Sequence, residues 1–208
     1  MMKKPTETQI VIAKFAVFAL CLAPFLVLAW DVYAQTLGPD PVAMLEHRTG
    51  DWALRLLLVT LAVTPLRQLT GVSALVRFRR MLGLFAFFYA SVHLSIYLFI
   101  DLGGFWRQLF GEIVKRPYIT AGFLAWLLLV PLAITSTKGM MRRLGRRWSQ
   151  LHRLVYAIGL FAVLHYLWLV KSGQEIAVRE PLIYLAIYLV LMAFRLPWHR
   201  LRRTREVS

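Results

Sequence analysis

The sequence predicts an all-α membrane protein, a bundle of six transmembrane helices, and three features support this prediction. Hydrophobic residues make up 59% of the 208 residues, and the mean hydropathy of +0.61 exceeds what the core of a soluble domain requires. The apolar residues form separate runs near the length of about 20 residues that crosses a bilayer. Charged residues gather between these runs, and no linker or internal repeat divides the chain, so we expect one domain covering residues 1–208.

Six apolar runs are the expected spans, and they cover approximately residues 10–30, 52–67, 81–100, 118–136, 150–170 and 181–197. The first is long enough to span and is not followed by a small-residue cleavage site, so we expect a retained helix rather than a signal peptide. The second and the last are short for a span. The second also carries Arg55 near its start, whose long side chain can reach toward the membrane surface.

The net charge of +15 is distributed in a way that predicts membrane topology rather than nucleic-acid binding. The basic residues form short clusters between apolar runs, not a continuous polar face. With six spans, one side of the membrane collects 18 of the 25 Lys and Arg residues, accompanied by only two acids, Glu7 and Glu206. The other side holds seven basic and eight acidic residues. The positive-inside rule therefore predicts a multi-pass protein with both termini in the cytoplasm.

Two histidines lie deep inside predicted spans, His93 in the third and His165 in the fifth. An imidazole in hydrocarbon costs free energy unless it is hydrogen-bonded or coordinates something. Both spans run outward, and His93 follows Arg80 by 13 residues while His165 follows Arg153 by 12, so the two rings lie at the same depth. Such a pair on parallel helices can supply both axial ligands of a haem iron. We therefore predict a haem held between the third and fifth spans.

Small residues one turn before each histidine, Ala90 and Ala162, would leave room for a flat macrocycle. The alternative interpretation is that each ring is a packing residue satisfied by a hydrogen bond. A zinc site is disfavoured, because no cysteine or carboxylate shares the depth of the pair. The single cysteine, Cys21, excludes an intrachain disulfide, and the lack of a CxxCH motif excludes a covalently attached haem. His47 and His199 fall in an outer loop and in the basic tail, where we expect solvated or lipid-facing side chains.

A third histidine, His152, lies at the cytoplasmic end of the fifth span, 13 residues before His165. On one ideal helix these two rings would point about 140° apart. The position in the third span that matches His152 in depth is Arg79, and a guanidinium stays protonated and offers iron no lone pair. Three interpretations stay open for this inner site: a second haem with an unusual ligand, a propionate anchor for a single haem, or a quinone or flavin site.

Several segments together resemble the MsrQ (formerly YedZ) family, the haem-binding membrane subunits of a bacterial system that reduces methionine sulfoxide in periplasmic proteins. These segments are GDWALRLLLVTLAVTPLR, RRMLGLFAFFYASVHLSIY, KRPYITAGF and TSTKGMMRRLGRRWSQLHRLVYAIGLFAVLHYLWLVK. The resemblance extends over nearly the whole chain. More distantly, the sequence is similar to the ferric reductase-like transmembrane domain of NADPH oxidases, in which two histidines on each of two helices hold stacked haems.

The resemblance implies a haem b protein of the bacterial inner membrane, with one or two haems, and FMN is also reported for the family. It implies electrons taken from the quinone pool and handed to MsrP, a periplasmic molybdopterin subunit that forms a heterodimer with the membrane protein. Carried onto this sequence, His93 and His165 match the outer haem ligands and His152 the inner histidine. Arg79 stands where the oxidases have a fourth histidine, which leaves the number of haems open.

The sequence therefore predicts an electron conduit rather than a site of bond chemistry. It contains no GxGxxG motif, so we expect no unaided oxidation of NAD(P)H. The inner basic cluster, with Arg142, Arg143, Arg146 and Arg147, could hold anionic lipid, haem propionates or a flavin phosphate. The acidic outer segment 31–51 is a candidate docking surface for the partner. Two alternatives remain: a cytochrome b561-like quinol oxidoreductase with another acceptor, and a haem-free membrane transporter, channel or assembly protein.

Overall fold

The computed structural model describes residues 5–170 and 179–195, and helices and their connections account for all of these residues. The elements are α1 (Glu7–Tyr33), α2 (Pro41–Thr70), η1 (Ser73–Arg77), α3 (Arg79–Ile96), η2 (Tyr97–Asp101), α4 (Trp106–Lys115), α5 (Pro117–Ile134), α6 (Lys138–Leu144), α7 (Arg146–Leu151), α8 (Leu154–Leu169) and α9 (Arg179–Ala193). The predicted all-α class is confirmed.

Five segments are long and apolar enough to cross a membrane. They are Glu7–Tyr33, Pro41–Thr70, Ser73–Asp101, Pro117–Ile134 and Arg146–Leu169. They correspond to the first five predicted spans. The sixth, predicted at 181–197, corresponds to the 15-residue helix α9, and the end of that run lies outside the described residues.

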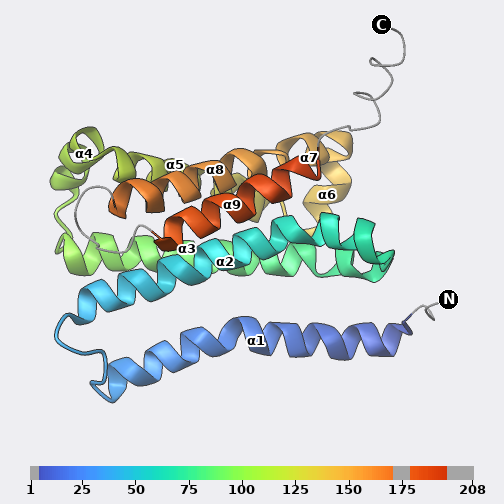
Figure 1. The fold of residues 1–208 in the computed structure, drawn as a ribbon, viewed down its shortest axis with the longest axis horizontal. Helices are drawn as coiled ribbons and strands as arrows, with labels where there is room; N and C mark the ends of the chain where they lie inside the picture. The colour runs from blue at the N-terminus through green and yellow to red at the C-terminus, as the bar shows by residue number, and fades with distance from the viewer. Residues whose placement is uncertain (1–4, 171–178, 196–208) are drawn as a thin grey trace, which may run out of the picture.

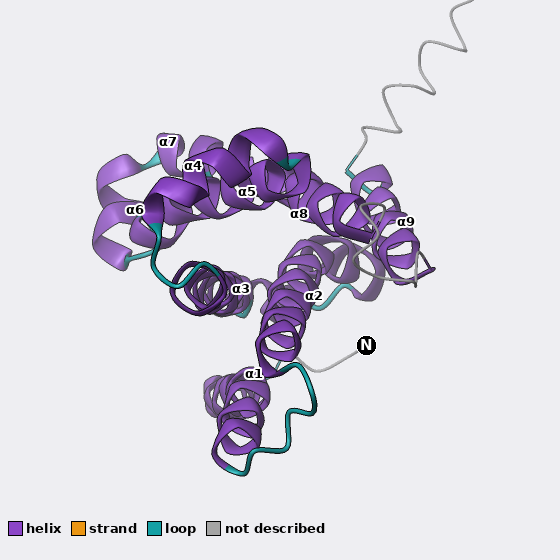
Figure 2. Ribbon diagram, turned by 90° about the vertical axis from the view of Figure 1, so that its left-hand side faces the viewer, coloured by secondary structure: helices purple, strands orange, loops and turns teal. Residues whose placement is uncertain are grey.

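Four helices, α2, α3, α5 and α8, surround the centre of the bundle. The closest associations pair α2 with α3 and α5 with α8, while α9 packs on α8 and α2. Figure 2, an end-on view, shows the α5–α8 layer facing the α2–α3 pair, with α1 standing to one side. In Figure 1 both α3 and α8 begin at the end of the bundle occupied by α6 and α7 and finish near α4. The third and fifth spans are therefore parallel, as predicted.

The limits of the helices follow from local chemistry. Thr6 and Gln9 form a reciprocal capping box that satisfies backbone N–H groups at the start of α1. The side chain of Asp40 accepts from the backbone N–H of Ala43 and starts α2, and Gly71 ends that helix in the left-handed conformation. Because Asp40 caps it there, α2 begins well before the predicted start at residue 52, and its first turns are polar.

The predicted helix over 150–170 is wrong in one respect, because the helix is interrupted near its N-terminal end. Helix α7 ends at Leu151 and α8 begins at Leu154, with His152 and Arg153 between them. Because His152 precedes α8, the angle of about 140° expected on one ideal helix does not apply to His152 and His165.

Helix α1 is joined to the rest of the bundle by polar contacts at its ends and at one point in its middle. Near one end Glu7 pairs with Arg77, at 2.7 Å, and near the other Asp31 pairs with Arg48. In the middle, the fully buried Tyr89 of α3 donates its hydroxyl hydrogen to the carbonyl of Cys21 (2.8 Å) and accepts from the N–H of Phe25 (3.0 Å). Tyr89 thus stands between two groups that would otherwise bond to each other within the helix.

Candidate functional site

A cavity of about 480 Å³ lies between α2, α3, α5 and α8, toward the end of the bundle near α4. His93 and His165 both line it. Its lining includes eight small residues: Ala43, Gly50, Ala53, Ala86, Ala90, Gly122, Ala125 and Ala162. Ala90 and Ala162 were the two predicted to leave room beside the histidines. The cavity falls within the size range of cofactor sites in proteins, roughly 300–1,000 Å³.

The structure brings the rings of His93 and His165 close together in this cavity, in a nearly perpendicular arrangement. Their ring centroids are 6.1 Å apart, and the ring planes meet at 74°. Two metal–imidazole bonds of about 2 Å each would span about 4 Å, and the remainder corresponds to the distance from each ring centre to its own nitrogen. The centroid spacing is therefore compatible with one metal ion between the two rings.

Hydrogen bonds determine which nitrogen of each ring carries the proton. Nδ1 of His93 lies 3.0 Å from the carbonyl oxygen of Glu46, and Nδ1 of His165 lies 2.7 Å from that of Tyr118. Since a carbonyl oxygen can only accept, each Nδ1 must be the donor. In a neutral imidazole this leaves the lone pair on Nε2, the arrangement that protein-bound metals impose on histidine ligands.

A glycine gives each ring access to its carbonyl. Gly50 follows Glu46 by one helical turn on α2, and Gly122 follows Tyr118 by one turn on α5. A Cβ at Gly50 would lie 3.3 Å from Nδ1 of His93, and a Cβ at Gly122 only 2.7 Å from Nδ1 of His165. Sequence reasoning missed both glycines. The signal was there, because a glycine inside a helix costs about 1 kcal/mol relative to alanine and calls for a packing reason.

Two buried polar atoms at the same cavity have no hydrogen-bond partner within the described part of the chain. They are Oε1 of Glu46 and the hydroxyl of Tyr97. A buried polar atom without a partner is costly, and it is expected to meet a polar group of a ligand. His47, predicted to be solvated or lipid-facing, is exposed and also borders this cavity.

The inner residues His152 and Arg79 lie away from the cavity lining. His152 sits between α7 and α8, where its ring stacks on Trp148 with centroids 3.9 Å apart. Its Nδ1 lies 3.1 Å from the carbonyl of Trp148, and its Nε2 lies 3.5 Å from the hydroxyl of Ser136. Arg79 is the first residue of α3 and is half-buried. The structure thus places these two residues at the opposite end of the spans from the His93 and His165 pair.

Comparison with known proteins defines the class of this fold and then its family. Residues 49–163 match the family described as ferric reductase like transmembrane component, so the chain is a ferric reductase-like membrane protein. It is 60% identical over 208 residues to the protein-methionine-sulfoxide reductase heme-binding subunit MsrQ of Xanthomonas campestris pv. campestris (strain 8004), covering 97% of this chain and 93% of that one. The subunit of the same name from Caulobacter vibrioides is 47% identical over 207 residues, covering 99% and 96%. The chain belongs to the MsrQ family. No solved structure matches it.

Proposed function

We propose that this protein is a haem b subunit that carries electrons from the quinone pool to MsrP, a periplasmic molybdopterin protein that reduces methionine sulfoxide in oxidised proteins. The observation that carries the proposal is the pair His93 and His165, whose ring centroids lie 6.1 Å apart in a cavity that small residues help to line. The relatives, which are heme-binding subunits of a protein-methionine-sulfoxide reductase, support it.

The residues around the cavity fit a haem. His93 and His165 would supply two neutral ligands through Nε2, and Gly50 and Gly122 leave the space in which those rings are held. The unpartnered hydroxyl of Tyr97 is a donor suited to a carboxylate such as a haem propionate. When bound, haem supplies an iron that accepts and releases one electron at a time. Coordination by both His93 and His165 would favour electron transfer over binding of oxygen.

The proposed topology places this site in the outer half of an inner-membrane protein with six spans, a single domain and cytoplasmic termini. Five candidate spans and the shorter α9 support the count. The basic segment with Arg142, Arg143, Arg146 and Arg147 lies on α6 and α7, at the opposite end of the bundle from the histidine cavity. A subunit in this orientation delivers electrons on the periplasmic side, where its partner is located. Its acidic segment 31–51 is the proposed docking surface for that partner.

The inner position is the proposed place for the second group that the family resemblance implies, either another haem or FMN. His152 offers an imidazole there, and Arg79 offers a cation suited to a propionate or a phosphate. The basic side chains of α6 and α7 lie near the same end of the bundle and can hold either group or anionic lipid.

The test is haem content of the purified protein measured by reduced-minus-oxidised spectra. We expect haem b bands in the wild type and their loss from the outer site in His93→Ala and in His165→Ala. His199→Ala, altered in the predicted basic tail, is the matched control and should keep all haem. Full haem content in both site variants would contradict the ligand assignment, and a wild type without haem b bands would eliminate electron transfer altogether.

A second measurement addresses the partner and the inner site. The protein should co-purify with a molybdenum-containing protein, and its deletion should abolish reduction of methionine sulfoxide in periplasmic proteins. Normal sulfoxide reduction without it would favour another acceptor, as in a cytochrome b561-like oxidoreductase. The haem-to-protein ratio of His152→Ala relative to wild type decides whether the inner site holds a haem.

A further inference from the structure

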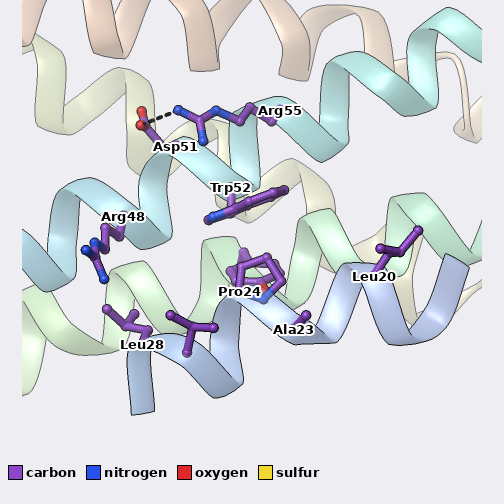
Figure 3. Close-up of a pocket in the computed structure, with 10 residues that line it drawn as sticks. Leu20, Ala23, Pro24, Leu28, Arg48, Asp51, Trp52 and Arg55 are labelled. Carbon is purple, nitrogen blue, oxygen red and sulfur yellow. Dashed lines mark hydrogen bonds and ion pairs between the residues drawn. The ribbon is translucent and has the colours of Figure 1, made fainter. Parts of the chain in front are cut away.

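A second cavity, of about 540 Å³, separates α1 from α2 (Figure 3). On the α1 side its lining includes Leu20 and Val27, which are 70% and 56% exposed. Because α1 is an apolar spanning helix, these exposed side chains face hydrocarbon. The cavity therefore opens sideways into the membrane, and its ligand must be a molecule that dissolves in lipid.

The opposite wall of this cavity is charged, which an acyl chain alone would not require. Asp51 and Arg55 of α2 form an ion pair at 2.9 Å, and the guanidinium of Arg55 lies 5.4 Å from the ring centre of Trp52. Figure 3 shows the Trp52 indole between this ion pair and Pro24 of α1. Charged groups at membrane depth are costly and point to a function. An aromatic plane beside donors and acceptors suits a flat ring that bears oxygen atoms.

Helix α1 adds a backbone acceptor to the same cavity. Proline has no N–H, so Pro24 cannot donate to the carbonyl of Leu20, four residues earlier, and both residues line the cavity. The next hydrogen bond of α1, from Phe25 to Cys21, is replaced by bonds of both groups to the hydroxyl of Tyr89. A carbonyl without its helical donor in a membrane needs another donor, and a ligand hydroxyl can be that donor.

The two cavities share one wall. Asp51 lines both of them. On α3, Tyr89 lines the cavity beside α1, while the adjacent Ala90 lines the cavity of His93 and His165. A helix with its side chains is about 10–12 Å in diameter, so a ligand beside α1 lies within about one helix diameter of the histidine site.

We propose that the cavity between α1 and α2 binds the membrane quinol that donates electrons to this protein. The inference rests on the proposed function. Oxidation of the quinol breaks its two O–H bonds and releases two protons and two electrons. Asp51 accepts the protons and passes them to outer water, and the acceptor of the electrons would be the haem that His93 and His165 hold. Reduction of one sulfoxide by the partner consumes two electrons and two protons, forms a thioether and releases water, which balances the reaction.

The first arm of the experiment measures binding. The full-length, haem-loaded protein in lipid nanodiscs is exposed to a photoreactive azidoquinone, and labelled peptides are mapped by mass spectrometry. We expect label on α1 near Ala23 and on α2 near Asp51, and about tenfold less of it in Ala23→Trp, whose side chain fills the cavity. Leu26→Trp is the matched control, because Leu26 lies on the same helix, is exposed and does not line the cavity.

The second arm measures reduction of the bound haem by a short-chain quinol in the same samples. Ala23→Trp should slow it about tenfold, while dithionite-reduced spectra and the rate in Leu26→Trp stay as in wild type. Asp51→Asn should keep the label but slow quinol oxidation, since an amide cannot take the proton.

Label that maps elsewhere, for instance beside His152, or an Ala23→Trp protein reduced as fast as wild type, would overturn the site while leaving the proposed function intact. If quinol fails to reduce wild-type haem that dithionite reduces, the quinone donor itself is wrong. A phospholipid that co-purifies with wild type but not with Ala23→Trp, without quinone labelling, would show a lipid site and overturn the inference.

Discussion

At the scale of single residues, the orientation of the His93 and His165 rings depends on two positions that carry no side chain. Gly50 and Gly122 each stand one helical turn after the carbonyl that a histidine Nδ1 bonds, and each has a histidine ring where a Cβ would be. The same local solution occurs on α2 and on α5. These glycines therefore control the direction in which each Nε2 presents its lone pair.

Replacing Gly122 with alanine should weaken haem binding. The new Cβ would lie 2.7 Å from Nδ1 of His165, closer than such atoms approach, so the ring must move and its bond to Tyr118 must lengthen. Loss of the hydrogen bond that a metal-bound histidine donates through its other ring nitrogen typically lowers the affinity for the metal group about 10- to 100-fold. Haem titration of the purified proteins, with circular dichroism to verify folding, measures the effect.

The order of effects provides the control for this prediction. Gly50→Ala should weaken haem binding less, because its Cβ would lie 3.3 Å from His93, and Gly139→Ala should have no effect, because nothing lies within 4 Å of that position. Equal affinity in Gly122→Ala and Gly139→Ala would refute the positioning role.

At the scale of secondary-structure elements, α1 is the least integrated of the spanning helices. Figure 1 shows it beside α2 and separated from α5 and α8. Besides the aromatic contacts of Phe18 and Phe25 with α3, it is held by Tyr89, whose hydroxyl bonds two backbone groups of α1 near Pro24. Loose packing there is also what leaves space for the second cavity.

Removing the Tyr89 hydroxyl should loosen α1. Tyr89→Phe loses both hydrogen bonds to the backbone of α1, and we expect it to destabilise the protein by about 1–3 kcal/mol. Thermal unfolding in detergent, followed by circular dichroism, measures this. The comparison is Tyr33→Phe, at a tyrosine of α1 that is 79% exposed. Identical melting curves for the two variants would count against the role of Tyr89 in holding α1.

At the scale of the whole molecule, the basic residues and the histidine cavity lie at opposite ends of the bundle. Basic residues of α6 and α7 lie at one end of the bundle, and the cavity lies toward α4 at the other. A protein oriented by the positive-inside rule then holds the cavity near the outer surface.

Single-cysteine labelling tests this orientation. Phe105→Cys, in the exposed connection before α4, should react with a membrane-impermeant maleimide in intact cells, and Gly139→Cys, on α6, should react only in inverted vesicles. Cys21 is buried and should stay unlabelled in both. The reverse pattern would place the histidine cavity at the cytoplasmic side and exclude delivery of electrons to a periplasmic partner.

The predictions that succeeded from sequence are those that depend on distance along a helix. Apolar runs located the five candidate spans, and counting from the inner arginines matched His93 with His165, because rise per residue converts position into depth. The resemblance to the MsrQ family was also visible in the residues alone, and the relatives confirm it. Sequence thus determined the class of the fold, the family and the pairing of two rings.

Only the tertiary structure decided what depends on lateral contact between helices. The approach of each ring to a carbonyl beside a glycine and the space between α1 and α2 both involve residues far apart in the chain. Periodicity reports which residues share a depth, but it does not report which faces of different helices meet. Depth is a property of one helix, whereas a binding site requires several helices packed in one definite arrangement.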